Sequence, residues 1–363
     1  MRRFVDAGFV LPGKTTTSEF GTLPVTESQA RGISRNPGDP GRTPGGSSSG
    51  AGAAVAAGMA PIAHAEDGGG PIRIPASCTG LAGLKPTRGL VTNLTVSLEG
   101  LATSGVLTRT VADTAAALDV LARHDPAAWW SPPTPPRPFA TAATMDPPTG
   151  LRIGVLAGSP AGGLTVHPAC AAAADTTVSA LAPAGHHLLD TPLPLPPPGD
   201  LTAAFTTIWN PGGAGIAHTD PDRAEPPNRA LRDAAQTTSS WAHAQAMTTT
   251  QQLSRRTVEG FLASLDLLLT PTMARLPPPI GAWKPGTGTN PTMAPVNSYP
   301  MAVSTSLFNP TGQPAISIPT HHHHATGPPA GVQIIAAPRR EDLLPQTSHT
   351  LELAHPWTDR RPA

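Results

Sequence analysis

The sequence predicts an α/β fold, because runs typical of strands alternate with stretches typical of helices. The clearest case is in the middle of the chain, where the β-branched run Leu151–Leu156 precedes a helix-like Ala169–Leu181 and a strand-like His186–Asp190. A strand, a helix and a second strand in this order are typical of a βαβ unit with parallel strands. Strand-like runs also lie near the C-terminus and an amphipathic stretch lies near residue 115, so the alternation extends beyond this unit.

Four further elements follow from apolar patterning. The segment Thr110–Leu121 places Val111, Ala115 and Leu118 on one helical face, and Thr110 is a suitable N-cap. Short apolar runs with strand character and a closing helix come later, at Ala315–Pro319, Gly331–Ala336 and Glu341–Ala354.

Proline marks the connections between these elements. The chain contains 46 prolines and 36 glycines in 363 residues, and many of the prolines occur in clusters at Ser131–Pro138, Pro192–Gly199 and Leu276–Pro291. We expect loops or extended chain there, because proline lacks the N–H that a helix or central strand would use.

Charge and composition exclude several classes of partner. The 24 basic and 24 acidic side chains balance, which removes an electrostatic case for nucleic acid or an anionic membrane. The longest mostly apolar stretch, Ala51–Ala63, is 13 residues, shorter than the roughly 18 that a membrane span requires. Two cysteines, Cys78 and Cys170, give no disulfide framework, and we expect a cytoplasmic protein without a cofactor.

Two glycine-rich turns carry the chemical signal. GGSSSG at 45–50 leads directly into an Ala-rich helical stretch, and such a turn can hold an oxyanion at a helix N-terminus. Asp67-Gly68-Gly69-Gly70 forms a second turn before Pro71–Pro75, which we predict to be strand-like. Backbone donors could converge on a substrate there. Taken alone, the first turn is equally consistent with a flexible linker and the second with an ordinary loop.

In this order, and followed by PAS and GLKPTRG, these segments resemble the amidase signature family of serine hydrolases. The resemblance continues in AGFVLPGKTTTSEFG, GVLTRTVADTAAALDVL, DLLLTPT, FNPTGQPAISIP and GVQIIA. It implies one domain over 1–363 with a mixed sheet between helical layers. Within that domain, 1–125 would form the signature core, 126–259 a variable Pro-rich middle and 260–357 the C-terminal part.

The resemblance also implies residue roles. The family hydrolyses amides with a serine nucleophile, a second serine that follows a cis peptide bond, and a lysine that draws a proton through the second serine. Ser47 matches the cis-serine, and Ser48 lies beside it as a supporting residue. Gly68, Gly69 and Gly70 match the oxyanion turn, while Asp67 and Arg73 match supporting positions.

The nucleophile position of the family motif Asp-x-Gly-Gly-Ser-(Ile/Val)-Arg is Pro71 in this chain. Proline supplies neither a hydroxyl nor an N–H, so an attacking group and a possible oxyanion donor are both lost. The family lysine belongs to a Lys-Asp motif that would lie upstream of Met1, and neither Lys14 nor Lys85 matches it. A further departure is Ser49, where the family usually has glycine.

Three interpretations follow. The first is an N-terminally truncated amidase-family protein that is impaired in hydrolysis and has a small-molecule amide as its ligand. The truncation would expose apolar surface, through which the chains would associate or aggregate. The second is a pseudoenzyme that binds a ligand or a partner without turnover. The third is an active amidase whose sequence contains an error at codon 71 and a misplaced start. Rescue of catalysis by Ser47, Ser48, Ser49 or Ser77 is disfavoured, because no lysine matches the activating position.

The run His321–His324 has no place in that pattern. Consecutive histidines in a loop seldom all point at one metal ion, so we expect a solvated loop rather than a metal site.

Overall fold

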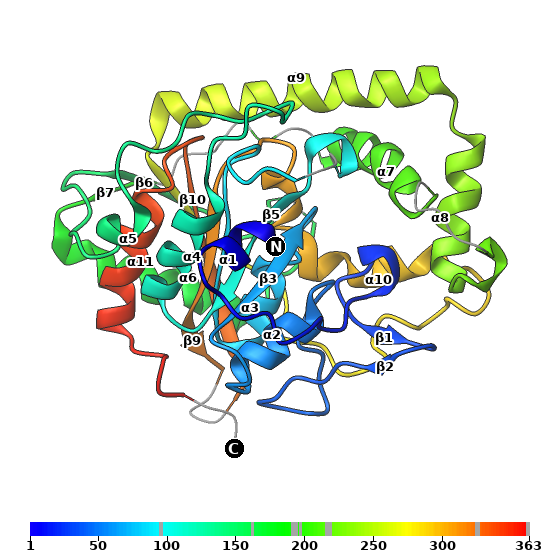
Figure 1. Cartoon of the computed structure of the whole chain (residues 1–363), viewed down its shortest axis with the longest axis horizontal. Helices are drawn as coiled ribbons and strands as arrows, with labels where there is room; N and C mark the ends of the chain where they lie inside the picture. Colours follow the sequence, from blue (N-terminus) through cyan, green and yellow to red (C-terminus); the bar gives the residue numbers. More distant parts are fainter. Residues whose placement is uncertain are drawn as a thin grey trace.

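The computed structural model describes residues 1–93, 97–160, 163–189, 195, 198–214, 220–323 and 327–360. Its centre is an eight-stranded sheet with the order β3-β5-β4-β9-β10-β8-β6-β7 (Figure 1). The strands are β3 (Ile62–Asp67), β4 (Ala82–Lys85), β5 (Thr103–Thr108), β6 (Arg152–Val155), β7 (His187–Leu189), β8 (Leu267–Pro271), β9 (Ala315–His322) and β10 (Pro329–Ala336). Two short strands, β1 (Glu27–Ser28) and β2 (Gly32–Ile33), form a separate hairpin.

The sheet is mixed. Neighbours from β3 through β8 in the spatial order pair antiparallel, whereas β8 pairs with β6 and β6 with β7 in parallel. The parallel pair β6–β7 is joined through α6 (Pro168–Leu181), which confirms the predicted βαβ unit. The predicted strands at Ala315–Pro319 and Gly331–Ala336 are also confirmed, as β9 and β10.

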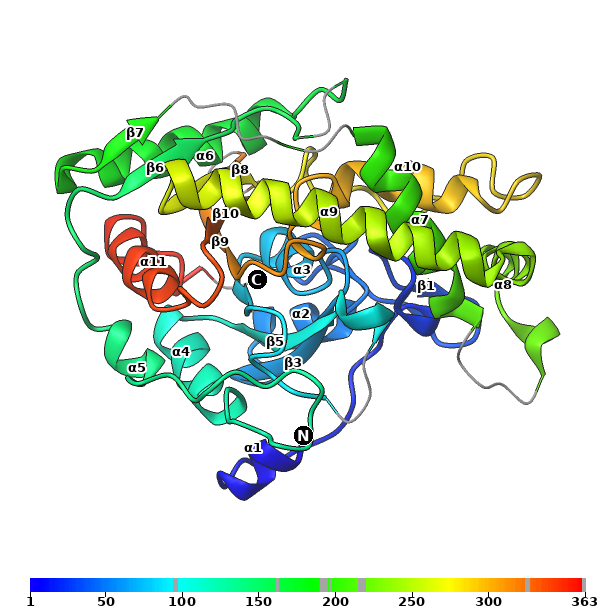
Figure 2. The same cartoon turned by 90° about the horizontal axis from the view of Figure 1, so that it is seen from above.

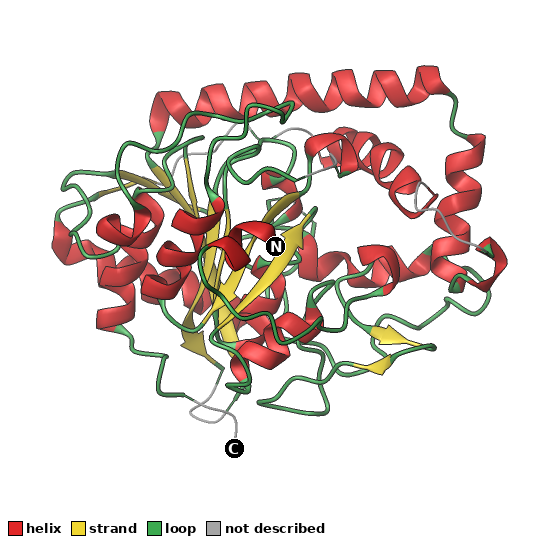
Figure 3. Ribbon diagram, in the orientation of Figure 1, coloured by secondary structure: helices red, strands yellow, loops and turns green. Residues whose placement is uncertain are grey.

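Helices cover both faces of the sheet (Figure 3). They are α1 (Arg2–Asp6), α2 (Ser49–Ala56), α3 (Arg73–Thr79), α4 (Val111–Leu121), α5 (Phe139–Ala142), α6, α7 (Pro198–Ala214), α8 (Pro226–Thr237), α9 (Ser240–Ser264), α10 (Met293–Ala302) and α11 (Leu343–Ala354). The helix predicted at 110–121 is α4, and the Thr110 side chain accepts a hydrogen bond from Asp113 N at 3.0 Å, as expected of an N-cap.

The core divides into clusters on the two faces. On one face, Leu118 of α4 and Leu344 of α11 pack with Ile316 and Ile334 of the central strands. On the other face, α2 and α3 pack against β5. Helix α9 lies alongside α7, and both contribute to this second side (Figure 2). No described helix combines the length and apolarity needed to cross a membrane.

The proline clusters behave largely as predicted. Residues Ser131–Pro138 are without helix or strand, and Leu276–Pro291 consists of turns and irregular chain. Most of Pro192–Gly199 lies outside the described residues, but Pro198 and Gly199 begin α7. Proline is tolerated in the first turn of a helix because the N–H it lacks would be unpaired there.

One predicted strand is wrong. Pro71–Pro75 does not form a strand, because α3 begins at Arg73 and includes Pro75 in its first turn. The Asp67 carboxylate accepts hydrogen bonds from the amides of Gly70 and Ile72, just before the helix. These contacts start a helix where the β-branched Ile72 and Ile74 had indicated extended chain.

Candidate active site

The first glycine-rich turn lies immediately before α2. The peptide bond between Gly46 and Ser47 is cis, the geometry that the resemblance implies for this position. The Ser47 carbonyl accepts hydrogen bonds from Ser18 N at 3.2 Å and from Ser49 N at 2.9 Å. A Cβ atom on Gly46 would lie 2.7 Å from Val25 N, so the close backbone approach requires glycine there.

The three serines of this turn differ in what they bind. Ser49 Oγ donates to the Gly45 carbonyl, so the residue that departs from the family pattern helps to close the turn. Ser48 is the N-cap residue of α2, and its side chain makes no capping bond. Within the described residues, the Ser47 hydroxyl forms no hydrogen bond, although Ser47 is only 7% exposed. Its oxygen is therefore not engaged by a neighbouring base or hydroxyl.

The second turn follows the C-terminal end of β3. Asp67 Oδ1 accepts from Gly70 N at 2.7 Å, and Thr305 Oγ1 donates to the Gly69 carbonyl at 2.7 Å. Gly70 has φ +138°, and a Cβ atom there would lie 2.5 Å from Ile74 Cδ1. No described residue accepts a hydrogen bond from the amides of Gly68 or Gly69. Two of the three predicted oxyanion glycines thus keep a free N–H, and the third N–H is already bonded.

Pro71 occupies the position after this turn and is buried. It cannot donate through its backbone nitrogen. The amides on either side of it, those of Gly70 and Ile72, both donate to the Asp67 carboxylate. The first turn packs nearby, because a Cβ atom on Gly45 would lie 3.0 Å from the Pro75 Cα atom of α3. Helix α3 therefore holds the two glycine-rich turns next to each other.

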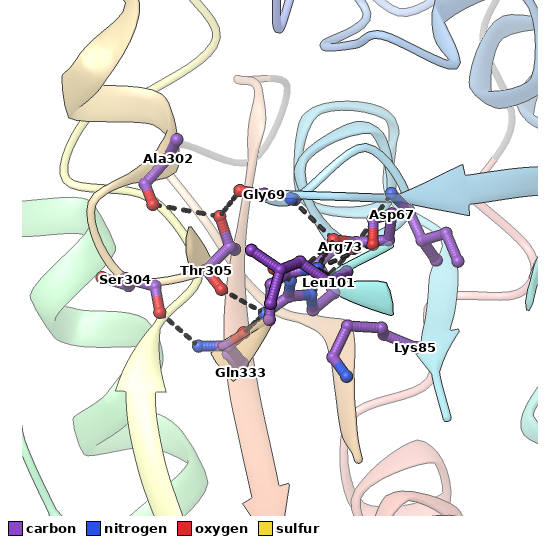
Figure 4. A network of polar contacts seen from close by, with 12 residues as sticks. Asp67, Gly69, Arg73, Lys85, Leu101, Ala302, Ser304, Thr305 and Gln333 are labelled. Atoms are coloured by element: carbon purple, nitrogen blue, oxygen red, sulfur yellow. Dashed lines mark hydrogen bonds and ion pairs between the residues drawn. The ribbon is translucent and has the colours of Figure 1, made fainter. Parts of the chain in front are cut away.

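A buried polar network holds the second glycine-rich turn in place (Figure 4). Arg73 Nε and Nη2 donate to the two oxygens of Asp67 at 2.9 and 2.8 Å, and both side chains are 0% exposed. Arg73 also donates to Thr305 O at 2.7 Å, Gln333 Oε1 at 2.6 Å and Asn309 Oδ1 at 2.7 Å. A buried ion pair of this kind requires further hydrogen bonds to offset its desolvation, and this one has them.

The same network extends through two amides. Asn309 Nδ2 donates to the Asp67 carbonyl at 2.7 Å and to the Leu101 carbonyl at 3.2 Å. Gln333 Nε2 donates to Thr270 Oγ1 at 3.0 Å and to Ser304 O at 3.1 Å. Residues of β3, β8 and β10, the residue Leu101 before β5, and the segment after α10 are thereby linked into one network around the Asp67 carboxylate.

Burial by itself raises the pKa of Asp67, but the adjacent Arg73 guanidinium and its hydrogen bonds outweigh burial and hold that pKa below its ordinary value. Lys85 at the end of β4 is 0% exposed, and Nζ donates to the Pro86 carbonyl at 3.0 Å. Burial, reinforced by the charge of Arg73, lowers the pKa of Lys85 to about 7. Asp67 is thus the ionised partner of Arg73 at neutral pH, and Lys85 titrates there.

An aromatic pair borders the second turn. The rings of Phe205 and Trp209, one helical turn apart on α7, stack with centroids 5.4 Å apart and an interplanar angle of 28°. A Cβ atom on Gly69 would lie 3.8 Å from Phe205 Cζ and 3.9 Å from Trp209 Cζ3. Both rings are half-buried, so the surroundings of the turn are apolar and partly open.

The structure therefore brings Asp67, Gly68–Gly70, Pro71 and Arg73 into one turn, with the Ser47 turn packed on the same helix. Sequence reasoning did not assign roles to Thr305, Asn309, Gln333 or the buried Lys85. A polar residue inside an otherwise apolar strand, as Gln333 is in GVQIIA, was the available signal.

Comparison with known proteins identifies this architecture. The family model described as Amidase matches residues 1–344. The chain belongs to the amidase signature family. It is 39% identical over 384 aligned residues to the 6-aminohexanoate-cyclic-dimer hydrolase of a Pseudomonas species, covering 100% of this chain and 77% of that protein. It is 38% identical to the 6-aminohexanoate-cyclic-dimer hydrolase of Paenarthrobacter ureafaciens, with the same coverage of 100% and 77%.

A solved structure agrees with the sequence matches. The structure of a 6-aminohexanoate cyclic dimer hydrolase complexed with substrate superposes on this chain with a TM-score of 0.93. The two are 38% identical, and the match covers 99% of this chain and 78% of the other. The predicted α/β fold of the family is confirmed, and the ancestry of the chain is that of enzymes that hydrolyse carbon–nitrogen amide bonds.

Proposed function

We propose that this chain is an amidase-family protein that binds amide-bearing small molecules at the second glycine-rich turn and is impaired in hydrolysing them. The observation that carries the proposal is Pro71 at the family's nucleophile position, within a turn whose other parts are in place. Removing a nucleophilic serine costs about 10⁶ in rate, and removing one oxyanion donor costs about 10²–10³, in enzymes where each has been measured.

The chemistry left at the site supports binding. The free amides of Gly68 and Gly69 can donate to a carbonyl oxygen, which is the ground-state counterpart of an oxyanion. The rings of Phe205 and Trp209 beside them offer an apolar, flat contact to an acyl group. We therefore expect amides with apolar or cyclic acyl portions, such as benzamide or the cyclic dimer of 6-aminohexanoate, to bind better than acetamide.

The Ser47 hydroxyl also fits this proposal. In the family it relays a proton between the nucleophile and the lysine, and here it has no hydrogen-bonding partner among the described residues. A hydroxyl without an adjacent base is a poor nucleophile, so Ser47 is not expected to attack in place of residue 71.

The test measures binding and turnover separately on the full chain. Calorimetric titration with benzamide and the cyclic dimer gives binding, and amine or ammonia release gives turnover. Gly69→Ala adds a methyl group at ordinary contact distance from both rings, so it fills the turn with little strain, and we expect it to weaken binding at least tenfold. Gly158→Ala is the matched control, since nothing lies within 4 Å of its Cβ position.

Binding without turnover that Gly69→Ala weakens and Gly158→Ala leaves unchanged would support the proposal. Turnover by the unmodified chain well above the uncatalysed rate would reject impairment and favour an active amidase. A serine codon at position 71 on resequencing would point to the same conclusion.

A further inference from the structure

A cavity lies at the end of β9 opposite to the Asp67 network. It has a volume of about 410 Å³ and is lined in part by His321 and His322 at the end of β9, His355 after α11, Arg360, and Thr176 of α6. The expectation of a solvated histidine loop is therefore wrong for the first two histidines, which are strand residues and half-buried.

The cavity is separate from the site described above. Ala315, the first residue of β9, pairs with Lys85 beside the Asp67 network, whereas His322 is the last residue of the same strand. At about 3.3 Å per residue, the two ends of β9 are roughly 23 Å apart. A ligand in the cavity would not contact the glycine-rich turns.

Among the described residues, the lining contains Arg360 and three histidines and no carboxylate. Arg360 is exposed, and its guanidinium makes no ion pair or hydrogen bond with a described side chain. The nearest acid on α11, Glu352, accepts from Val111 N at 3.1 Å and lies 3.7 Å from His349, so it faces other partners. Asp175 and Asp359 adjoin lining residues in sequence, but both are exposed and neither lines the cavity.

This arrangement suits an anion better than a metal. No group of three or more candidate ligands with metal-binding geometry exists among the described residues. By contrast, a guanidinium presents a planar fork of donors that matches carboxylate and phosphate. The imidazoles of His321 and His355 and the Thr176 hydroxyl can each add one donor. The volume falls within the roughly 300–1,000 Å³ of small-molecule sites and exceeds what a bare oxyanion fills.

We propose that this cavity is a binding site for a small organic anion that carries a carboxylate or phosphate group, with Arg360 as the principal charged contact. The proposal is independent of whether the chain hydrolyses amides, because no residue of the cavity belongs to the glycine-rich turns.

The experiment titrates the full chain calorimetrically with benzoate, phenyl phosphate, inorganic phosphate and the uncharged benzamide at constant ionic strength. Arg360→Ala removes the guanidinium without removing a hydrogen bond or ion pair to a described side chain, and we expect it to weaken anion binding at least tenfold. Arg360→Lys should restore part of that loss. Arg31→Ala, which removes another exposed arginine without a side-chain partner in the described chain, is the matched control.

Anion binding that Arg360→Ala weakens, and that Arg31→Ala and Gly69→Ala leave unchanged, would support the site. Preference for benzoate or for phenyl phosphate would then distinguish a carboxylate from a phosphate ligand. Equal binding to the parent and to Arg360→Ala, binding reproduced by chloride, or no binding of any anion at millimolar concentration would overturn it.

Discussion

Replacing Arg73 by methionine is expected to destabilise the fold severely. The side chain is fully buried and makes five hydrogen bonds, two of them to the Asp67 carboxylate. Methionine fills a similar volume but leaves Asp67 buried without its counter-charge, which costs about 3–5 kcal/mol, and it orphans the Gln333 and Asn309 oxygens. We expect a loss of roughly 5 kcal/mol, comparable with the whole stability of many domains.

The matched control is Arg152→Met. Arg152 also forms a bidentate pair with an aspartate, Asp266, but the two side chains are 38% and 31% exposed. Solvent screens that pair, so the same substitution should cost about 1 kcal/mol or less. The difference in unfolding free energy between the two variants therefore reports the effect of burial, because the chemical change is the same in both.

The assay is urea unfolding followed by far-UV circular dichroism, with a stabilising osmolyte added if Arg73→Met is unfolded in water. Combining Arg73→Met with Asp67→Asn removes the unpaired charge, so the double variant should recover at least about 2 kcal/mol relative to additivity. If Arg73→Met is within about 1 kcal/mol of Arg152→Met, or if the cycle shows no coupling, the buried pair does not hold this turn in the way described.

Three further predictions concern single positions. Burial lowers the pKa of Lys85 in the folded chain to about 7. Above pH 7 the unfolded chain therefore binds more protons than the folded chain does. The free energy of unfolding should rise by up to about 1.4 kcal/mol per pH unit from pH 7 to 8.5. Urea unfolding across that range should show this rise in the parent and in the exposed control Lys14→Met but not in Lys85→Met, and a rise that persists in Lys85→Met would contradict it. Gly70→Ala places a methyl group against Thr305 and Ile74 at a residue with φ +138°. The thermal unfolding midpoint of this variant should fall by several degrees, while that of Gly158→Ala stays unchanged. Equal midpoints for the two variants would be inconsistent with the turn geometry. The last variant is tested in a chain fused to an N-terminal segment with the family's Lys-Asp motif. There, Pro71→Ser should raise amide turnover at least about 10³-fold, and adding Ser47→Ala should abolish that gain. Identical turnover with proline and with serine would show that residue 71 is not the attacking position.

The elements that the sequence predicted are those in which local pattern and tertiary role agree. Helix α4 has an N-cap and a regular apolar face, and β9 and β10 are apolar runs in the middle of the sheet, so periodicity alone locates them. Helix α3 was misassigned because Ile72 and Ile74 favour extended chain locally. The carboxylate that starts the helix belongs to Asp67, which accepts from the amide of Ile72.

The supporting network was beyond sequence reasoning for a different reason. Asn309 and Gln333 bond to Arg73 across separations of more than 230 residues, and nothing in the spacing of their own segments indicates which buried charge they satisfy. The only local clue is that a buried polar residue must find a partner. The identity of that partner depends on the sheet order, in which β10 and β3 are not neighbours.

The network also explains how the turn can keep its structure with proline at position 71. The bonds that hold it are made by the Asp67 carboxylate, the amides of Gly70 and Ile72, the Thr305 hydroxyl and the Arg73 guanidinium, none of which uses the side chain of residue 71. Gly70 also tolerates the restriction that a following proline places on the backbone. If residue 71 is the attacking position, as proposed, a serine there would contribute reactivity without contributing to the scaffold, and proline in its place would leave every one of these supporting bonds intact.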